Sequence, residues 1–382
     1  MDSFGALLSD EERAWQQSVR AFVEREVVPS AARWDEQGRY PRPLLERLGE
    51  LDWLGTAFPE ECGGSGGGPV EYAILCAELA RGSAGVALGV YVHTALASAA
   101  ILHLGSDAQR RELLPAALRG ERVGCWAYAE AGAGADAASV ATRARRDGDG
   151  WVLDGAKLYI TNAPIADFAV IVAATAPERG LKGLSLFAVE RDAPGLAIGP
   201  PMRKLGMGAS EMAEIVLDGC RVGAGSLLGT EDAGFLEAME VLTLGRIAAA
   251  SFACGLGEAA RRAALEHTRE RVQFGGPLTR KQFVRFTHAD LQTRLEAAWQ
   301  LTLAAARLAA AGKPHSEQAS MAKLLASETC TWACERGLHL HGAHGYMRES
   351  AAQRFYRDCK VLELGEGTSE VQRETIARGM GI

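Results

Sequence analysis

The spacing of apolar residues changes twice along this 382-residue chain, and the two changes leave few possible folds. From residue 9 to about residue 120, apolar side chains recur at helical intervals, as at Trp15, Val19, Phe22 and Val23. From about 123 to 229 the interval falls to two, which predicts short β-strands, and from 235 onward the helical interval returns. We therefore predict a multi-domain α+β protein: an all-α domain at 1–122, a β-barrel or β-sandwich domain at 123–233 and a four-helix bundle at 234–382.

Cap and turn residues give approximate bounds for several elements. Ser9, followed by acidic residues, predicts the start of the first helix. The turn at 147–150 (DGDG) separates strands predicted at 140–146 and 151–160, and it is typical of a hairpin because Asp-Gly tolerates a positive φ. Further strands are predicted at 168–173, 184–189 and 214–217. The predicted bundle helices span about 235–271, a segment through 291–308 that ends at Gly312 and Pro314, 316–340 and 369–378.

Composition and charge exclude several classes of protein. An apolar fraction of 48% with 23% charged residues is typical of a soluble globular protein, and a net charge of −7 gives no general attraction to nucleic acid or anionic membranes. No apolar run is expected to reach the length of a membrane span, and the first residues lack the features of a signal or transit peptide. We therefore predict a cytoplasmic protein with neither nucleic acid nor membrane as a partner.

Three patterns that could bind a ligand are interpreted as structural. Cys330 and Cys334 share a helix face without nearby histidines, so we place them in the core and predict no metal site. The glycine-rich run at 63–68 has no preceding strand and no following lysine, which favours a flexible loop over a phosphate cradle. The segment 132–134 (GAG) lacks the helix and the distant acidic residue of a dinucleotide-binding fold.

The segment 365–373 (GEGTSEVQR) places Glu366 between two glycines just before a predicted helix. Ser369 is the expected N-cap, Gln372 would complete a capping box, and Gly379 would end the helix. Glycine lets a ligand come close to the turn, and the helix dipole favours a negative charge there. Glu366 is therefore a candidate base that faces a ligand; the alternative is an ordinary helix start with a solvated glutamate.

Four motifs follow one another along the chain. They are 126–136 (WAYAEAGAGAD), 157–162 (KLYITN), 271–275 (RVQFG) with Gln282, and 342–346 (GAHGY) followed by Arg357, Asp358 and the Glu366 turn. Together with the order of the domains, these motifs resemble the acyl-CoA dehydrogenase family of flavoproteins over essentially the whole chain. The resemblance implies the fold of that family, with FAD bound between the β domain and the bundle.

The resemblance also implies roles for individual residues. The first two motifs would line the flavin ring, with the Thr161 hydroxyl near N5. Arg271 would reach the pyrophosphate of FAD in a neighbouring subunit, which implies a homo-oligomer, either a tetramer or a dimer. The implied cofactor contacts are Tyr128, Ala129, Tyr159, Ile160, Thr161, Arg271, Phe274, Gln282, His339, Gly342, Ala343, Thr368 and Glu370.

The implied reaction is α,β-dehydrogenation of an acyl thioester. Glu366 would take a proton from Cα while a hydride leaves Cβ for flavin N5, and the site would have to raise its pKa from about 4.3 toward neutral. Glu363 is a competing base, whereas Gly245 occupies the position that supplies the base in some relatives. The residues implied to contact the substrate are Ala135, Thr243, Arg246 and Gly367.

The chain departs from the family pattern near the substrate. Ala129, Ala131 and Ala135 replace a hydroxyl residue, a proline and a serine, and Thr243 stands where an aspartate often meets the pantetheine arm. These departures leave open whether the thioester carries CoA or an acyl-carrier protein, in fatty acid or secondary metabolism. An electron-transfer flavoprotein or a similar acceptor is the expected redox partner. Two alternatives remain: a flavin oxidase or monooxygenase of the same fold, and a non-catalytic, DNA-binding relative.

Overall fold

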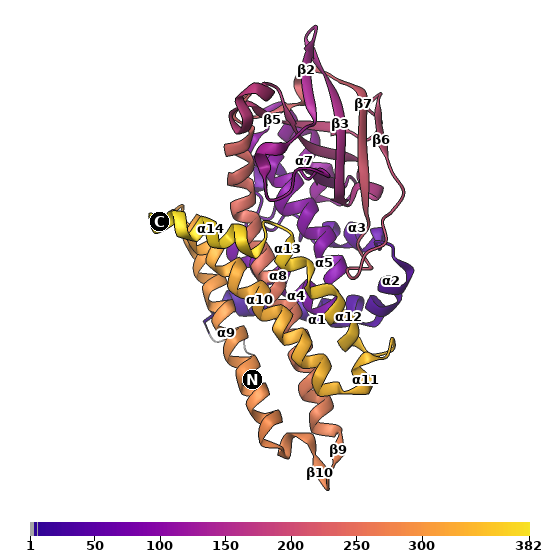
Figure 1. Cartoon of the computed structure of the whole chain (residues 1–382), viewed down its shortest axis with the longest axis vertical. Helices are drawn as coiled ribbons and strands as arrows, with labels where there is room; N and C mark the ends of the chain where they lie inside the picture. The colour runs from indigo at the N-terminus through magenta and orange to yellow at the C-terminus, as the bar shows by residue number, and fades with distance from the viewer. Residues whose placement is uncertain (1–3, 6) are drawn as a thin grey trace.

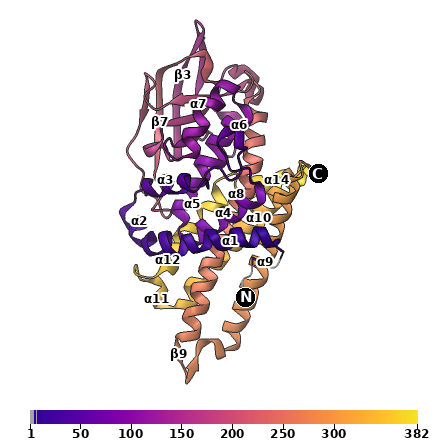
Figure 2. The same ribbon diagram turned by 180° about the vertical axis from the view of Figure 1, so that it is seen from behind.

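The computed structural model describes residues 4–5 and 7–382, and it has the predicted order of helices, strands and helices (Figure 1). The N-terminal helices are α1 (Asp10–Phe22), α2 (Ala31–Gln37), α3 (Arg42–Glu50), α4 (Pro69–Gly82), α5 (Ala84–Tyr91), α6 (Ala99–Leu104) and α7 (Asp107–Leu118). Between α5 and α6 the chain widens into a π-helical turn at Val92–Ser98. The view from behind in Figure 2 shows α1 running past α4, against which it packs.

The predicted start of the first helix is confirmed. The Ser9 hydroxyl accepts a hydrogen bond from the backbone N–H of Glu12 at 3.1 Å, and the Glu12 carboxylate accepts one from the backbone N–H of Ser9 at 2.8 Å. This reciprocal pair is a capping box, which satisfies two backbone donors that the helix itself leaves unpaired.

The β domain is an eight-stranded sheet with strand order β6-β7-β3-β2-β4-β5-β8, and β1 pairs in parallel with β4. The strands are β1 (Gly124–Ala127), β2 (Arg143–Asp147), β3 (Gly150–Thr161), β4 (Phe168–Ala174), β5 (Leu184–Glu190), β6 (Leu196–Ile198), β7 (Met212–Val222) and β8 (Leu227–Leu228). The predicted hairpin is formed by β2 and β3, with Asp147 paired to Gly150 and Gly148 at a φ of 62°. Strand β7 is longer than the strand predicted at 214–217.

The C-terminal part consists of long helices that lie side by side (Figure 1). They are α8 (Gly234–Glu270), α9 (Gln282–Ala310) and α10 (Ser316–His341), followed by α11 (Ala343–Tyr346), α12 (Ala351–Cys359), α13 (Val361–Leu364) and α14 (Ser369–Gly379). A small hairpin, β9 (Val272–Gln273) and β10 (Gly276–Pro277), joins α8 to α9. The predicted bundle corresponds to α8, α9, α10 and α14, and α12 was not predicted.

Helix α8 joins the bundle to the N-terminal helices. At Gly255 a Cβ atom would lie 1.9 Å from the carbonyl oxygen of Ala77 in α4, so this close approach requires glycine. The two helical parts share one apolar core, and the β domain has a second core in which Trp151 packs edge-on against Phe187 at 5.2 Å. The site described below lies where the β domain meets both helical parts.

Two helical segments have the length and hydropathy of a membrane span, so the expectation that no apolar run would reach that length was wrong. They are Ala84–Leu104 and Gly234–Glu270, and 89% and 78% of their most apolar windows are buried within the protein. Core helices satisfy the same criteria of length and composition.

Two of the patterns that we interpreted as structural can be located in the fold: the cysteine pair lies in the core, and the glycine-rich run lies in a loop. Cys330 and Cys334 are buried in α10, which confirms their place in the core. Within residues 4–5 and 7–382 there is no group of three or more His, Cys, Asp or Glu side chains that could hold a metal ion. The glycine-rich run at 63–68 forms the loop before α4, and Gly68 is the N-cap of α4.

Candidate active site

A cavity of about 680 Å³ lies between the β domain, the α5 region and α8. On the β side it is lined by five of the predicted cofactor contacts: Tyr128, Ala129, Tyr159, Ile160 and Thr161. The other walls are mainly apolar, with side chains of α5, the π-helical turn and α8 such as Leu88, Leu96, Leu242 and Phe252. Glu366 lines the same cavity, and it is the one carboxylate that does so among the residues described. The fold thus brings the predicted base to the predicted flavin-side residues.

A buried ion pair holds the two β segments at the cavity. The Nζ atom of Lys157 lies 2.6 Å from Oε1 of Glu130, and the two side chains are 0% and 6% exposed. Lys157 also donates to the carbonyl of Tyr128 at 3.1 Å. Glu130 accepts hydrogen bonds from the backbone N–H groups of Ala141 and Thr142 at 2.7 and 3.1 Å. The pair therefore fixes the loop of the 126–136 motif against β3.

Strand β3 is irregular where it reaches the cavity. Its register with β7 shifts between Lys157 and Ile160, and Tyr159 has a φ of 62°, which is rare for an aromatic residue. The bulge leaves Tyr159 exposed at the cavity while Ile160 is buried. Asn162 also has a positive φ, and its side chain donates to the carbonyl of Gly89 in α5 at 2.8 Å. Strained backbone of this kind is concentrated at functional sites.

The turn that carries Glu366 is fixed by hydrogen bonds to its carbonyl groups. Glu366 and Gly367 have φ values of 58° and 81°. Lys323 of α10, which is buried, donates to the Gly367 carbonyl at 2.5 Å. The side chain of Gln372 donates to the carbonyls of Glu366 and Gly367 at 2.9 and 3.1 Å. These bonds stabilise the left-handed conformation that presents the Glu366 side chain to the cavity.

The capping box predicted for the last helix was wrong. Thr368 is the N-cap of α14, and its hydroxyl accepts from the backbone N–H of Val371 at 3.3 Å. Ser369 is the first helical residue, and Gln372 binds the turn. Serine and threonine are both good N-caps, so the sequence could not distinguish two adjacent hydroxyl residues.

Burial makes Glu366 a stronger base than an ordinary glutamate. The residue is half-buried as a whole, but its Oε1 atom is enclosed and has no partner of full hydrogen-bond geometry among the described residues. Burial raises the pKa of its carboxyl to about 7, against smaller opposing effects of the nearby Tyr91 hydroxyl and the charges of Arg246 and Lys323. The carboxyl therefore changes its charge near neutral pH.

Glu363, the competing base, has a different environment. It forms an ion pair with Lys360 at 2.6 Å and does not line the cavity. Burial acts to raise the pKa of its carboxyl, but hydrogen bonds from Lys360 and Thr331 outweigh this effect and lower the pKa. A paired carboxylate with a lowered pKa is a poor base for a carbon acid.

The cavity fits a flat aromatic cofactor. Trp126, Tyr128 and Tyr159 supply aromatic walls, and the Trp126 and Tyr128 rings meet edge to face at 6.5 Å. The Tyr128 hydroxyl is buried without a hydrogen-bond partner in the part of the chain that the structure describes. Such a group needs a partner, and the polar edge of an isoalloxazine ring supplies acceptors. Thr161 adds a second hydroxyl to this wall.

Comparison with known families covers nearly the whole chain. Models of the acyl-CoA dehydrogenase N-terminal, middle and C-terminal domains match residues 9–121, 125–220 and 232–381. The chain belongs to the acyl-CoA dehydrogenase family. It is 39% identical to the mitochondrial short-chain specific acyl-CoA dehydrogenase of Rattus norvegicus over 362 residues, which cover 95% of this chain and 88% of the relative.

Solved structures give the same assignment. Butyryl-CoA dehydrogenase from Megasphaera elsdenii has a TM-score of 0.95 and 33% identity, covering 98% of this chain and 99% of that one. A prolyl acyl carrier protein oxidase has a TM-score of 0.95 and 28% identity, covering 98% and 100%. Members of the acyl-CoA dehydrogenase family bind FAD and dehydrogenate acyl-CoA, so the cofactor of this protein is FAD.

In this acyl-CoA dehydrogenase, the other predicted FAD contacts lie away from the cavity. They are exposed residues at the end of α8, in the β9–β10 hairpin, at the start of α9 and at the junction of α10 with α11, at the end of the bundle opposite the β domain (Figure 1). This set is Arg271, Phe274, Gln282, His339, Gly342 and Ala343. The rings of Phe283 and His339 lie 6.5 Å apart and show that the start of α9 meets the end of α10. Within the described chain none of the six lines the cavity.

Four further predicted contacts lie at or near the Glu366 turn. Arg246 of α8 is buried and acts on Glu366 through its charge. The Gly367 carbonyl is bound by the protein itself, and Thr368 caps α14. Glu370 is exposed in the first turn of α14.

The two remaining substrate contacts are placed less directly. Ala135 is exposed beside Gly134, which lines the cavity. The Thr243 hydroxyl donates to the carbonyl of Met239 in its own helix at 2.7 Å. The hydroxyl of Thr243 is therefore already engaged within its own helix.

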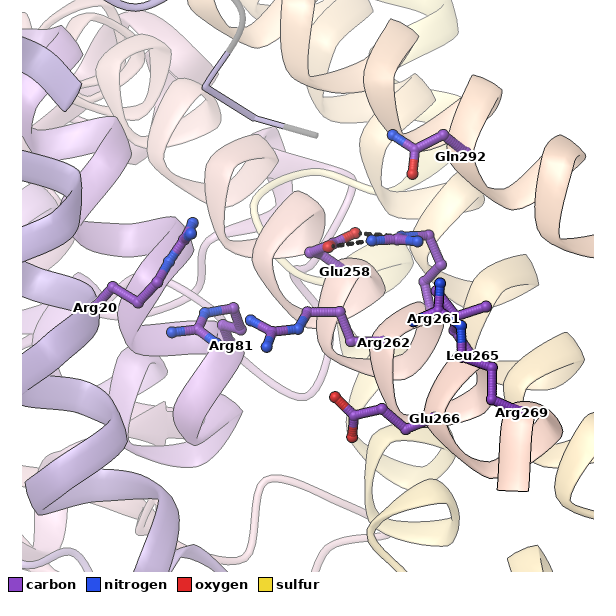
Figure 3. A pocket seen from close by; sticks show the side chains of 9 residues that line it. All are labelled: Arg20, Arg81, Glu258, Arg261, Arg262, Leu265, Glu266, Arg269 and Gln292. Carbon is purple, nitrogen blue, oxygen red and sulfur yellow. Dashed lines mark hydrogen bonds and ion pairs between the residues drawn. The ribbon is translucent and has the colours of Figure 1, made fainter. Parts of the chain in front are cut away.

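Figure 3 shows a second hollow, of about 380 Å³, where α1, α4, α8 and α9 meet. It is lined by Arg20, Arg81, Glu258, Arg261, Arg262, Leu265, Glu266, Arg269 and Gln292. Glu258 and Arg261 form two hydrogen bonds of 2.6 Å, and Arg20 and Arg81 both bind Glu78. Because these opposite charges pair within the protein, we interpret the hollow as an ion-pair network between helices and not as part of the active site.

Sequence reasoning missed two residues that act on Glu366, namely Tyr91 and Lys323. Lys323 gave a usable signal, because it stands on the apolar face of α10 between Ala319 and Ala326, where a solvated lysine is not expected. Tyr91 gave none, since a tyrosine in an apolar helix is usually an ordinary core residue.

Proposed function

We propose that this enzyme removes hydrogen from Cα and Cβ of an acyl-CoA, and that Glu366 is the base that takes the Cα proton. The observation that carries the proposal is the position of Glu366 as the one carboxylate at the cavity among the described residues. Its pKa of about 7 supports the role, because a base works best when its pKa lies near the working pH.

Different residues of the chain carry out different parts of the proposed reaction. Tyr128, Tyr159 and Thr161 would hold the flavin ring of FAD, which would supply the acceptor for the hydride that leaves Cβ as the Cα–Cβ double bond forms. Glu366 holds the proton from Cα on its carboxylate, while Leu96 and Phe252 enclose the acyl chain and exclude water. The backbone N–H of Glu366 has no acceptor in the described part of the chain. It donates to the thioester carbonyl and stabilises the negative charge that develops there.

Anaerobic addition of a short saturated acyl-CoA, such as butyryl-CoA, to the FAD-loaded protein tests this function. We expect the visible absorbance of the flavin to bleach, because two electrons pass from the thioester to the cofactor. Spectra that stay unchanged with every straight, branched and carrier-bound acyl thioester would contradict the proposal. Protein that is colourless and cannot be reconstituted with FAD would contradict it as well.

Gly245 makes room for the proposed base. A Cβ atom at this position would lie 2.5 Å from Oε1 of Glu366 and 3.0 Å from Cδ2 of Leu96. We expect Gly245→Ala to displace the carboxylate and lower kcat by about 100-fold, as misplacement of a reacting group by roughly 1 Å can do. Gly257→Ala in the same helix is the control, because the one close contact of its Cβ would be with the flexible end of Leu295 at 2.6 Å, and its other neighbours lie at 3.5 Å or more. Equal kcat values for the two variants would refute this placement of the base.

The group that carries the acyl chain is a narrower proposal. CoA is the carrier in the named dehydrogenase relatives, and the similarity to a carrier-protein oxidase supports a carrier-protein thioester as the second candidate. Rates with one acyl group on CoA and on carrier protein would distinguish them. Formation of hydrogen peroxide in air would identify an oxidase, whereas we propose an electron-transfer flavoprotein as the acceptor of a dehydrogenase.

We also propose a homo-oligomer, either a dimer or a tetramer. The six predicted FAD contacts that lie away from the cavity are exposed at the end of the bundle, together with large apolar side chains. Phe274 and Tyr346 are 88% and 81% exposed there. A second subunit would cover these side chains and bring Arg271 to its FAD. The molar mass in solution, measured by light scattering, tests the proposal.

A further inference from the structure

Tyr91 lies where α5 ends and the π-helical turn Val92–Ser98 begins. Such π-helical turns are uncommon and occur often at functional sites. Tyr91 is 5% exposed and lines the same cavity as Glu366, although the two residues come from opposite ends of the chain. The change from α-helix to π-helix therefore occurs at a tyrosine that shares the cavity with Glu366, the proposed base.

Two buried polar atoms at this point lack a partner. The hydroxyl of Tyr91 and Oε1 of Glu366 have no partner of full hydrogen-bond geometry among residues 4–5 and 7–382. Buried polar groups are nearly always paired, which makes each of these atoms a natural partner for the other. The neighbouring phenol of Tyr72 is already engaged, since it lies 2.5 Å from the hydroxyl of Thr94.

The chemistry of the two groups fixes the direction of the hydrogen bond. Burial raises the pKa of the Tyr91 hydroxyl well above its usual value, and the charge of Glu366 raises it further. Tyr91 therefore stays protonated and donates, while an ionised carboxylate can only accept. The interaction with Tyr91 acts on Glu366 in the opposite sense to burial and lowers the pKa of its carboxyl.

Other elements bring charge to the same carboxyl but leave Oε1 unbound. Arg246 of α8 and Lys323 of α10 both lower the pKa of Glu366 through their charges. Lys323 is bound to the carbonyl of Gly367 at 2.5 Å, and Arg246 has a buried Nε without a partner in the described structure. The two cations thus favour the ionised form of Glu366, but neither binds Oε1. The Tyr91 hydroxyl is then the group that orients the carboxylate.

We propose that Tyr91 is a positioning residue, whose hydroxyl donates a hydrogen bond to Glu366 and holds the base ionised and directed into the cavity. This inference rests on the proposed function, because it takes Glu366 as the base. The hydroxyl opposes burial, which by itself would leave more of the carboxyl protonated at neutral pH.

Tyr91→Phe removes the hydroxyl and keeps the ring. We expect the acid limb of kcat/KM to move up by about one pH unit, the usual size of a charge-assisted hydrogen bond on this scale. At each pH on the acid limb, kcat/KM of the variant should be about tenfold lower than that of the native enzyme. At high pH the two values should approach each other. Tyr72→Phe is the matched control, since it removes a buried phenol from the same core and should leave the acid limb in place.

Infrared spectroscopy gives a readout that requires no turnover. The protonated-carboxyl band that disappears in Glu366→Gln identifies the Glu366 carboxyl, and its pH midpoint should rise by about one unit in Tyr91→Phe, with or without FAD. In the native protein the band should have the lowered frequency of a hydrogen-bonded carboxyl, which tests the inference even if the variant does not fold. An unchanged midpoint and limb, with Glu366→Gln inactive, would overturn this inference alone. Full activity of Glu366→Gln would overturn the proposed function itself.

Discussion

Replacement of Glu366 by glutamine is expected to lower kcat with an acyl-CoA by at least about 100-fold, because loss of a general base commonly costs a factor of about 10²–10⁴. Glutamine keeps the size and polarity of the side chain but cannot take the Cα proton. FAD binding should persist, since Glu366 is not among the β-domain residues that line the flavin wall. Stopped-flow measurement of flavin reduction isolates the affected step.

The pH dependence provides a second measurement of the same group. The Glu366 carboxyl, with a pKa of about 7, must be ionised to accept a proton. The kcat/KM of the native enzyme should therefore fall about tenfold for each pH unit below that value and level off above it. The residual rate of Glu366→Gln should lack this limb, because the titrating group is gone.

Glu363→Gln is the matched control for this prediction. It makes the same chemical change three residues earlier, at a carboxylate that is paired with Lys360 and does not line the cavity. We expect its rate to stay within a few-fold of the native value. If Glu363→Gln were the slower variant, or if Glu366→Gln kept the native rate, the base would have to be placed elsewhere.

The turn around Glu366 shows how far the sequence alone could lead. The two flanking glycines and the following cap residues predicted a turn before a helix, and the structure has one, with Glu366 at a φ of 58°. Whether its carboxylate is solvated or buried depends on α8, α10 and the π-helical turn, which are distant in sequence. The alternative of an ordinary helix start with a solvated glutamate could therefore be rejected only once Gly245 and Leu96 were found around the Glu366 side chain.

Elements with a local signal were predicted closely, whereas short strands without one were missed, for a physical reason. The apolar stripe of α10 and the glycine and proline after α9 are local signals, so α10 and the end of α9 lie close to their predicted positions, although α9 begins nine residues before the predicted segment. Strand β1 is short and buried throughout, and its parallel partner β4 lies some forty residues further on. Pairing of this kind is decided by tertiary packing, which local alternation does not record.

Replacement of Lys157 by methionine is expected to lower the free energy of unfolding by about 3–5 kcal/mol, the usual effect of removing one partner of a buried ion pair. Methionine fills most of the lysine volume, but it leaves the Glu130 carboxylate buried without its cation. The hydrogen bond to the Tyr128 carbonyl is lost as well, so FAD should bind more weakly. Urea unfolding and FAD titration measure the two effects.

The loss should also depend on pH, in a direction that identifies its cause. An unpaired buried carboxyl at Glu130 has a folded-state pKa above its unfolded value, so the variant loses stability as pH rises through that range. The deficit relative to the native protein should be smaller near pH 5 than near pH 8. Arg378→Met is the control, because its ion pair with Glu374 is 76% and 61% exposed and should change stability by less than about 1 kcal/mol. Equal effects of Lys157→Met and Arg378→Met would show that the buried pair does not hold the flavin-side loop in place.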